Sequence, residues 1–131
     1  MMEEKISFEH GALPGSLELA YLGDTVYDLF VRRELVRQGG KVKNLHARAI
    51  RLVCAHAQSE AFLRIEDMLD EEEAGVARRA RNAHQSPPRS ADPAEYHRAT
   101  AFEALIGYLY CMGRMERIRD LLRQAVIFEN A

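Results

Sequence analysis

Apolar residues recur at helical spacing along most of this chain, and the strictly alternating stretches that strands need are nearly absent. The longest stripe predicts a helix from about Ser16 to Gln38, which ends at Gly39-Gly40. Its apolar positions are Leu19, Leu22, Val26, Leu29 and Leu35. A second helix is predicted from an N-cap at Asn44 through Val53.

Signals at helix ends predict a third helix and a loop. Asp70 is a candidate N-cap for a helix to about Arg81. This helix carries acidic residues in its first turn and basic residues in its last, which suits the helix dipole. Residues 84–92 follow; they contain Pro87-Pro88 and show no apolar periodicity, so they indicate a loop.

A strong start signal closes that loop and predicts the next helix. Asp92 is a candidate N-cap, Pro93 occupies the first helical position, and Glu95 lies three residues after the cap. The helix is expected to reach about Met112, and a last helix to run from about 115 to 128. The sequence therefore predicts an all-α fold, a compact helical bundle that forms a single domain over residues 1–131.

Composition narrows the class of protein without changing the fold. The chain has 131 residues, of which 47% are hydrophobic and 29% charged, the balance of a soluble globular domain. Its longest nearly apolar run, residues 104–113, is too short to span a bilayer. The acidic N-terminus does not resemble a signal peptide, so we expect a cytoplasmic protein. Cys54 and Cys111 lie in apolar context and are expected to be buried free thiols.

The charges are strongly partitioned although the net charge is only -2. Residues 32–58 carry seven basic residues and one acid, whereas residues 59–73 carry seven acids and one basic residue. Residues 74–98 are basic again, with five arginines against two acids. Such blocks are typical either of solvated helix faces or of surfaces that bind a polyanion, and charge alone leaves both open.

Two carboxylates lie within apolar helical segments and are the candidates for chemistry. Asp24 follows Gly23, and Glu103 lies four residues before Gly107. Burying a carboxylate is costly unless it is paired, hydrogen-bonded or bound to a metal. Glycine is unfavourable inside a helix unless another backbone or a ligand comes close. Two acids from separate helices would suit Mg²⁺, but simple pairing of each acid with an arginine or a backbone group remains an alternative.

Other cofactor chemistry has little support in the sequence. No zinc-binding or nucleotide-binding consensus is present, and none of the five histidines shows ligand spacing. We therefore do not expect histidine catalysis.

The two acidic segments resemble a known family. The segment Leu19-Ala20-Tyr21-Leu22-Gly23-Asp24-Thr25-Val26-Tyr27 resembles the signature helix of ribonuclease III, and residues 102–110 (FEALIGYLY) resemble its second acidic helix. The likeness covers about residues 16–126, with no room afterwards for a double-stranded-RNA-binding domain. This combination is similar to Mini-ribonuclease III, the short bacterial branch of the family.

This resemblance implies a ribonuclease III-like endonuclease domain and a magnesium-dependent endoribonuclease that acts on double-stranded RNA as a cytoplasmic homodimer. The implied substrate is the precursor of 23S ribosomal RNA, trimmed at both ends to leave 5′-phosphate and 3′-hydroxyl termini. A ribosomal protein that shapes the substrate is a further candidate partner. Asp24 and Glu103 map onto catalytic, metal-binding carboxylates.

The chain also departs from the ribonuclease III pattern at two carboxylate positions. Ala20 stands where that family has a glutamate, and Thr100 stands where it has an aspartate. Thr100, one turn before Glu103, is therefore only a candidate to hydrogen-bond a metal-bound water. The loss of two carboxylates keeps open a catalytically silent RNA-binding dimer, and a purely helical adaptor is the other alternative.

A protein without a separate binding domain must bind duplex RNA on its catalytic body, through phosphates and 2′-hydroxyls. The block that leads into the proline loop is the best candidate surface, although dipole pairing at a helix end could explain each arginine alone. The predicted RNA-binding residues are Arg78, Arg79, Arg81, Asn82, His84 and Arg98, with Arg89 and His97 extending the track and Lys41, Lys43 and His46 as a second choice.

Overall fold

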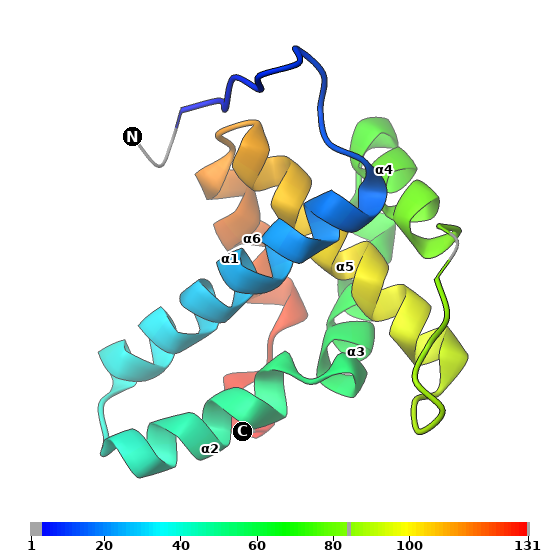
Figure 1. Cartoon of the computed structure of the whole chain (residues 1–131). Coiled ribbons are helices and arrows are strands. Elements are labelled where there is room, and N and C mark those ends of the chain that lie inside the picture. The colour runs from blue at the N-terminus through cyan, green and yellow to red at the C-terminus, as the bar shows by residue number, and fades with distance from the viewer. Residues whose placement is uncertain (1–3, 84, 131) are drawn as a thin grey trace.

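The computed structural model describes residues 4–83 and 85–130, and these residues form helices and connecting loops with no strand (Figure 1). The α-helices are α1 (Ser16–Gln38), α2 (Val42–Val53), α3 (Ala55–Ile65), α4 (Glu71–Arg81), α5 (Pro93–Cys111) and α6 (Met115–Ala125). Two short 3-10 helices span Glu66–Met68 and Phe128–Asn130. The predicted all-α fold is confirmed.

The helices begin and end where strong local signals predicted. α1 ends at Gln38 and is followed by its C-cap Gly39, whose φ of 90° is a conformation that side-chain-bearing residues rarely adopt. At the start of α4, the Asp70 carboxylate accepts a hydrogen bond from the Glu73 backbone (2.8 Å), and the Glu73 side chain accepts one from the Asp70 backbone (3.0 Å). Asp92 caps α5 by accepting hydrogen bonds from the backbone amides of residues 94 and 95.

The structure corrects the prediction where local signals are weak. Asn44 is not an N-cap, because α2 already begins at Val42. α3 was not predicted at all: it is separated from α2 only by Cys54, whose backbone is extended and whose side chain forms no cap. Cys54 is exposed at this break, so its predicted burial is wrong, whereas Cys111 is buried as expected. α6 ends at Ala125, short of the predicted residue 128.

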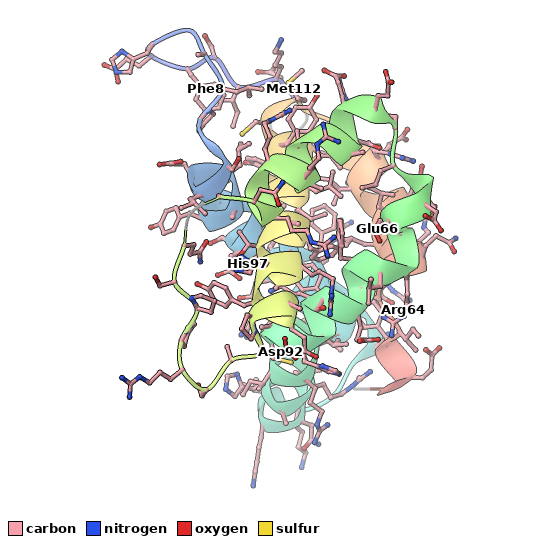
Figure 2. The ribbon with its side chains drawn as sticks, turned by 90° about the vertical axis from the view of Figure 1, so that its right-hand side faces the viewer. Phe8, Arg64, Glu66, Asp92, His97 and Met112 are labelled. Carbon is pink, nitrogen blue, oxygen red and sulfur yellow. The ribbon has the colours of Figure 1, made fainter. Side chains whose placement is uncertain are left out.

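α5 is the central helix of the bundle. It runs behind α1 in Figure 1 and through the middle of the view in Figure 2, from its N-cap Asp92 to Met112 at its other end. Most of its residues are buried, because α1, α3, α4 and α6 all pack against it. The N-terminal segment reaches the end of α5, where the Ile6 amide donates a hydrogen bond to the Cys111 carbonyl (2.8 Å).

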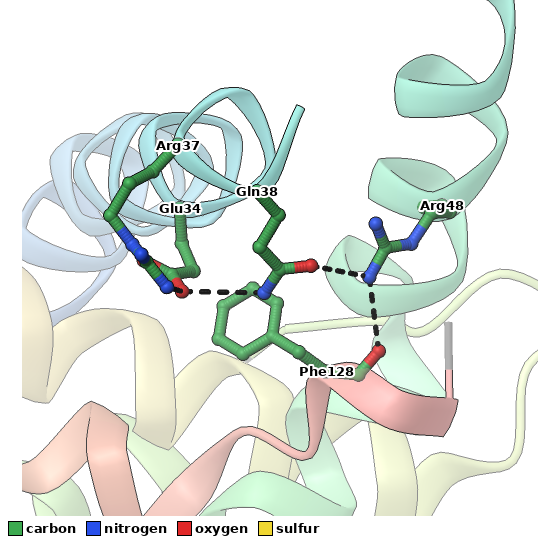
Figure 3. A network of polar contacts seen from close by, with 5 residues as sticks. All are labelled: Glu34, Arg37, Gln38, Arg48 and Phe128. Atoms are coloured by element: carbon green, nitrogen blue, oxygen red, sulfur yellow. Dashed lines mark hydrogen bonds and ion pairs between the residues drawn. The ribbon is translucent and has the colours of Figure 1, made fainter. Parts of the chain in front are cut away.

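A polar network joins the end of α1 to α2 and to the C-terminal segment (Figure 3). Arg48 of α2 donates hydrogen bonds to the Gln38 side chain (2.9 Å) and to the Phe128 carbonyl (3.4 Å). Arg37 forms an ion pair with Glu34 (2.6 Å). Two of the basic residues in the segment 32–58, Arg37 and Arg48, therefore form contacts within the protein. None of the helices in the described chain is both long and apolar enough to cross a membrane.

Candidate metal-dependent active site

The crossing of α1 over α5 depends on two glycines. A Cβ atom added to Gly23 would lie 1.7 Å from the Glu103 carbonyl oxygen, and one added to Gly107 would lie 2.0 Å from the Leu19 carbonyl oxygen. The two backbones therefore touch at this point, as the glycines in the sequence predicted. Asp24 and Glu103 lie beside these contacts, so the same crossing brings the two acids together.

Asp24 and Glu103 are hydrogen-bonded to one another and line one cavity of about 360 Å³. Asp24 is exposed at this cavity, which differs from the buried carboxylate that its apolar neighbours predicted. Glu103 is half-buried. The side chains around the cavity are Leu17, Ala20, Tyr21, Asp24, Val53, Ala55, Gln58, Gln85, Tyr96, Ala99, Thr100 and Glu103.

The electrostatics of this pair favour a positively charged ligand. Burial, followed by the hydrogen bond and the charge of Asp24, raises the pKa of Glu103 to about 8, although a hydrogen bond from Gln58 opposes the shift. Near neutral pH Glu103 therefore keeps its proton, which a divalent cation could replace. Two carboxylates from separate helices beside an open cavity are a donor set that fits Mg²⁺, which binds one or two carboxylates and keeps several waters.

The positions where the ribonuclease III pattern has further acids line the same cavity. Ala20 contributes only a methyl group, and Thr100 is 5% exposed. The Thr100 hydroxyl donates a hydrogen bond to the Tyr96 carbonyl (3.0 Å), so its hydrogen is already engaged. The Thr100 oxygen can still accept a hydrogen bond from a water in the cavity.

Gln58 is a site residue that sequence reasoning missed. It lies on the unpredicted α3 and donates hydrogen bonds to the Glu103 carboxylate (3.3 Å) and to the Val53 carbonyl (2.9 Å). A signal was available, because Gln58 continues the apolar positions Ala61, Phe62 and Ile65 at helical spacing. Gln85 from the proline loop also lines the cavity, and its amide is hydrogen-bonded to the Tyr96 hydroxyl.

His56, Glu60 and Glu95 form a second group whose ligand atoms lie within 4.8 Å of one another. His56 and Glu60 are four residues apart on α3, so the prediction that no histidine has ligand spacing is wrong for His56. The His56 Nδ1 atom lies 2.5 Å from a Glu95 carboxylate oxygen, and this hydrogen bond raises the pKa of the exposed imidazole. An ion pair accounts for this contact without a metal.

The predicted RNA-binding residues have different environments. Arg78, Arg79 and Asn82 are exposed at the end of α4. Arg81 is also exposed and lies 3.7 Å from a Glu66 carboxylate oxygen, a surface pair of little strength. Arg98 is half-buried and donates a hydrogen bond to the buried Ser59 hydroxyl (2.7 Å), which gives it a structural role on α5.

The remaining members of the predicted RNA track are less well defined. His84 lies outside the described residues. His97 is half-buried and lies on α5, where Figure 2 labels it. Lys41, Lys43 and His46 are exposed at the beginning of α2, and Arg89 is exposed in the loop.

An exposed apolar surface adjoins the cavity. Tyr21 is 85% exposed although it lies in the middle of an apolar segment of α1, and Leu17, one turn earlier, is 38% exposed. Both residues also line the cavity. Tyr21 and Leu17 therefore form a small exposed apolar area at the edge of the cavity.

Comparisons with known proteins show which proteins this chain is similar to. The family model described as "Ribonuclease III domain" matches residues 17–114. The "Mini-ribonuclease 3" of Symbiobacterium thermophilum is 47% identical over 114 residues, which cover 86% of this chain and 88% of the relative. The "Mini-ribonuclease 3" of Brevibacillus brevis is 46% identical over 115 residues, covering 86% of each chain. A crystal structure of a protein from Fusobacterium nucleatum superposes with a TM-score of 0.78 at 35% identity, covering 83% of this chain and 90% of that one.

Proposed function

The chain belongs to the ribonuclease III family of endoribonucleases, and from this premise we propose that it matures 23S ribosomal RNA precursor by magnesium-dependent cleavage of its double-stranded ends. The family acts on double-stranded RNA and generally requires a divalent metal. The single observation that carries the proposal for this chain is the meeting of Asp24 and Glu103 in one open cavity. The proposed enzyme is a cytoplasmic single domain that acts as a homodimer.

The proposed roles follow from the positions of the side chains. Asp24 is exposed at the cavity and supplies the principal metal-binding carboxylate, while the half-buried Glu103 supplies the second. A Mg²⁺ held by these two carboxylates would supply Lewis-acid chemistry, which activates a water and neutralises charge on the scissile phosphate. Glu103 would hold the cation as a carboxylate, after loss of the proton that its raised pKa retains near neutral pH. Thr100 accepts a hydrogen bond from a water on the same side of the cavity.

RNA binding is assigned to the exposed basic residues at the end of α4. Arg78, Arg79 and Asn82 provide the principal contacts to the sugar-phosphate backbone, since no ion pair with an acid is found for these arginines among the described residues. Arg81, His84 and Arg98 complete the proposed set. Arg98 is the least available of these for RNA, because its side chain also donates a hydrogen bond to the Ser59 hydroxyl. The anionic substrate is attracted by this local surface although the whole chain is weakly acidic.

A homodimer follows from the chemistry of duplex cleavage. One active site cuts one strand, so cutting both strands requires two sites that a twofold axis relates. The apolar surface around Tyr21 and Leu17 adjoins the cavity and is suitable for the contact between protomers. A ribosomal protein that shapes the precursor is the other partner that we propose.

Cleavage of structured precursor RNA by the wild type and by Asp24→Asn, with and without Mg²⁺, tests the proposal. We expect Asp24→Asn to bind RNA but not to cleave it. The matched control is Asp28→Asn, one turn later on α1, where the carboxylate is paired with Arg32 (2.8 Å) and should not matter for cleavage. Full activity of Asp24→Asn would remove this residue from the mechanism.

Two other outcomes would reject the enzyme assignment for this chain. Binding of duplex RNA by the wild type without cleavage at any Mg²⁺ concentration would identify a silent RNA-binding dimer, the reading that Ala20 and Thr100 support by their lack of a carboxylate. Absence of any affinity for duplex RNA would identify a helical adaptor.

A further inference from the structure

Gln58 is a buried polar residue that the proposed roles above leave unused. It lies on α3, is only 2% exposed, and lines the same cavity as Asp24 and Glu103. A primary amide at such a position costs stability unless its donors and acceptor are satisfied. Neighbouring positions on the buried face of α3 hold Ala61, Phe62 and Ile65, so an apolar residue would suit the packing.

The amide group of Gln58 has one orientation that its neighbours permit. Its nitrogen lies 2.9 Å from the Val53 carbonyl oxygen and 3.3 Å from a carboxylate oxygen of Glu103. Both neighbours accept hydrogen bonds, so the nitrogen and not the oxygen must face them. The two donors of one amide therefore connect the last residue of α2 to the acidic side chain on α5.

The other end of the amide shows that packing alone does not explain this residue. The Gln58 Oε1 atom is buried and has no hydrogen-bond partner within the described part of the chain. An unsatisfied buried carbonyl oxygen is unfavourable, and each one in a folded protein calls for an explanation, such as a bound water or a role at a site. The two hydrogen bonds that the nitrogen donates at the other end of the amide offset part of this cost, so the side chain is held by its contacts with Val53 and Glu103.

We propose that Gln58 is a positioning residue for the active site, because its amide holds the Glu103 carboxyl in the orientation that faces Asp24 and lets both acids bind one divalent cation. This inference rests on the proposed function. Glutamate has three side-chain torsions, and a second contact is needed to hold the carboxyl in one place. A neutral amide is suited to this task, whereas a lysine or arginine in the same place would bring a positive charge that competes with the cation.

Metal binding by the RNA-free protein is the decisive measurement. We expect Gln58→Met, which keeps the length and removes the donors, to weaken the dissociation constant for Mn²⁺ by about tenfold or more in calorimetry or electron paramagnetic resonance. The kcat for duplex RNA should fall by about 10- to 100-fold while KM changes by no more than about twofold, and added Mg²⁺ should restore part of the rate. Gln58→Asn, which keeps the amide but shortens its reach, should behave in the same way and serves if the methionine variant does not fold.

Two controls link the effect to Glu103. Gln85→Met removes the other glutamine of the cavity, whose amide is bonded to Tyr96, and should leave Mn²⁺ affinity unchanged. Adding Gln58→Met to a Glu103→Gln background should cause no further loss of Mn²⁺ affinity, because the carboxylate that Gln58 holds is already gone.

The outcomes separate this inference from the proposed function. Wild-type Mn²⁺ affinity in folded Gln58→Met and Gln58→Asn would overturn the positioning role, even if both variants melt at lower temperature. An equal loss of affinity on top of Glu103→Gln would overturn it as well. If the wild type itself binds no Mn²⁺ and Asp24→Asn cleaves normally, the proposed function fails first, and the Gln58 inference fails with it.

Discussion

Substituting alanine for either glycine at the crossing of α1 and α5 should destabilise the protein and disturb the site together. The added Cβ of Gly23→Ala would lie 1.7 Å from the Glu103 carbonyl oxygen and 2.7 Å from its carbonyl carbon. The Cβ of Gly107→Ala would lie 2.0 Å from the Leu19 carbonyl oxygen. Ordinary contacts begin at 3.4 Å, so these carbons approach too closely by about 1.7 Å and 1.4 Å. The obstacles are backbone atoms, which cannot rotate away, so the helices must separate.

The expected change in the free energy of unfolding is the difference between two opposing effects. Alanine is favoured over glycine inside a helix by about 1 kcal/mol. Overpacking costs about 1 to 3 kcal/mol and occasionally more, and a clash between two backbones belongs at the upper end or beyond. We therefore expect a net loss of about 2 to 3 kcal/mol, which corresponds to a fall in Tm of roughly 6 to 12 °C for a domain of this size. Because Asp24 moves relative to Glu103 by more than an ångström, kcat should fall by about 100-fold.

Thermal unfolding of the metal-free protein, followed by calorimetry, measures the stability term, and cleavage well below the lower Tm measures the activity term. Gly75→Ala on α4 is the matched control. The nearest atom to its added Cβ is the flexible Arg79 guanidinium at 3.2 Å, so its Tm should stay the same or rise by a few degrees. A Tm for Gly23→Ala and Gly107→Ala as high as that of Gly75→Ala would refute the close crossing.

Three further predictions address the rest of the molecule. Arg117→Met should cost about 3 kcal/mol in urea unfolding, because it leaves the buried Glu73 carboxylate (1% exposed) without its ion pair of 2.8 Å. Burial raises the pKa of Glu73, but hydrogen bonds from Arg117 and the Asp70 backbone outweigh burial, so the pKa is lowered. The stability that the ionised Glu73 contributes is therefore fully present above pH 4.5 and is lost as the pH falls through the lowered pKa. Arg117→Met should therefore lose less stability than the wild type on acidification, and an equal loss would contradict this. Replacing Arg79 by alanine should weaken duplex-RNA binding and reduce the slope of log K against log salt by about 0.7 to 0.9, whereas an unchanged slope would exclude a phosphate contact. Tyr21→Asp should yield a monomer in sedimentation velocity, and a dimer of undiminished stability would place the interface elsewhere.

The sequence alone predicted the elements that depend on neighbouring residues. The capping box of Asp70 and Glu73, the Asp92-Pro93 start and the Gly39 stop each involve hydrogen bonds or backbone angles within a few residues. These local interactions give the same result in many tertiary surroundings, so the predicted helices at these positions are confirmed. α3 was not predicted because it lacks such a local signal: it begins one residue after α2 without a side-chain cap. The packing of its buried face against α5 stabilises it instead.

Only the tertiary structure decided which candidate residues meet. Periodicity marked Asp24 and Glu103 as unusual, but their contact depends on the crossing of two helices far apart in the sequence. Gln58 reaches that site from a third helix, and Arg98 turns out to hold Ser59. Which side chains converge on one place is determined by how helices pack, and packing depends on the shapes of all the surfaces involved, whereas a helix boundary depends on a few adjacent residues.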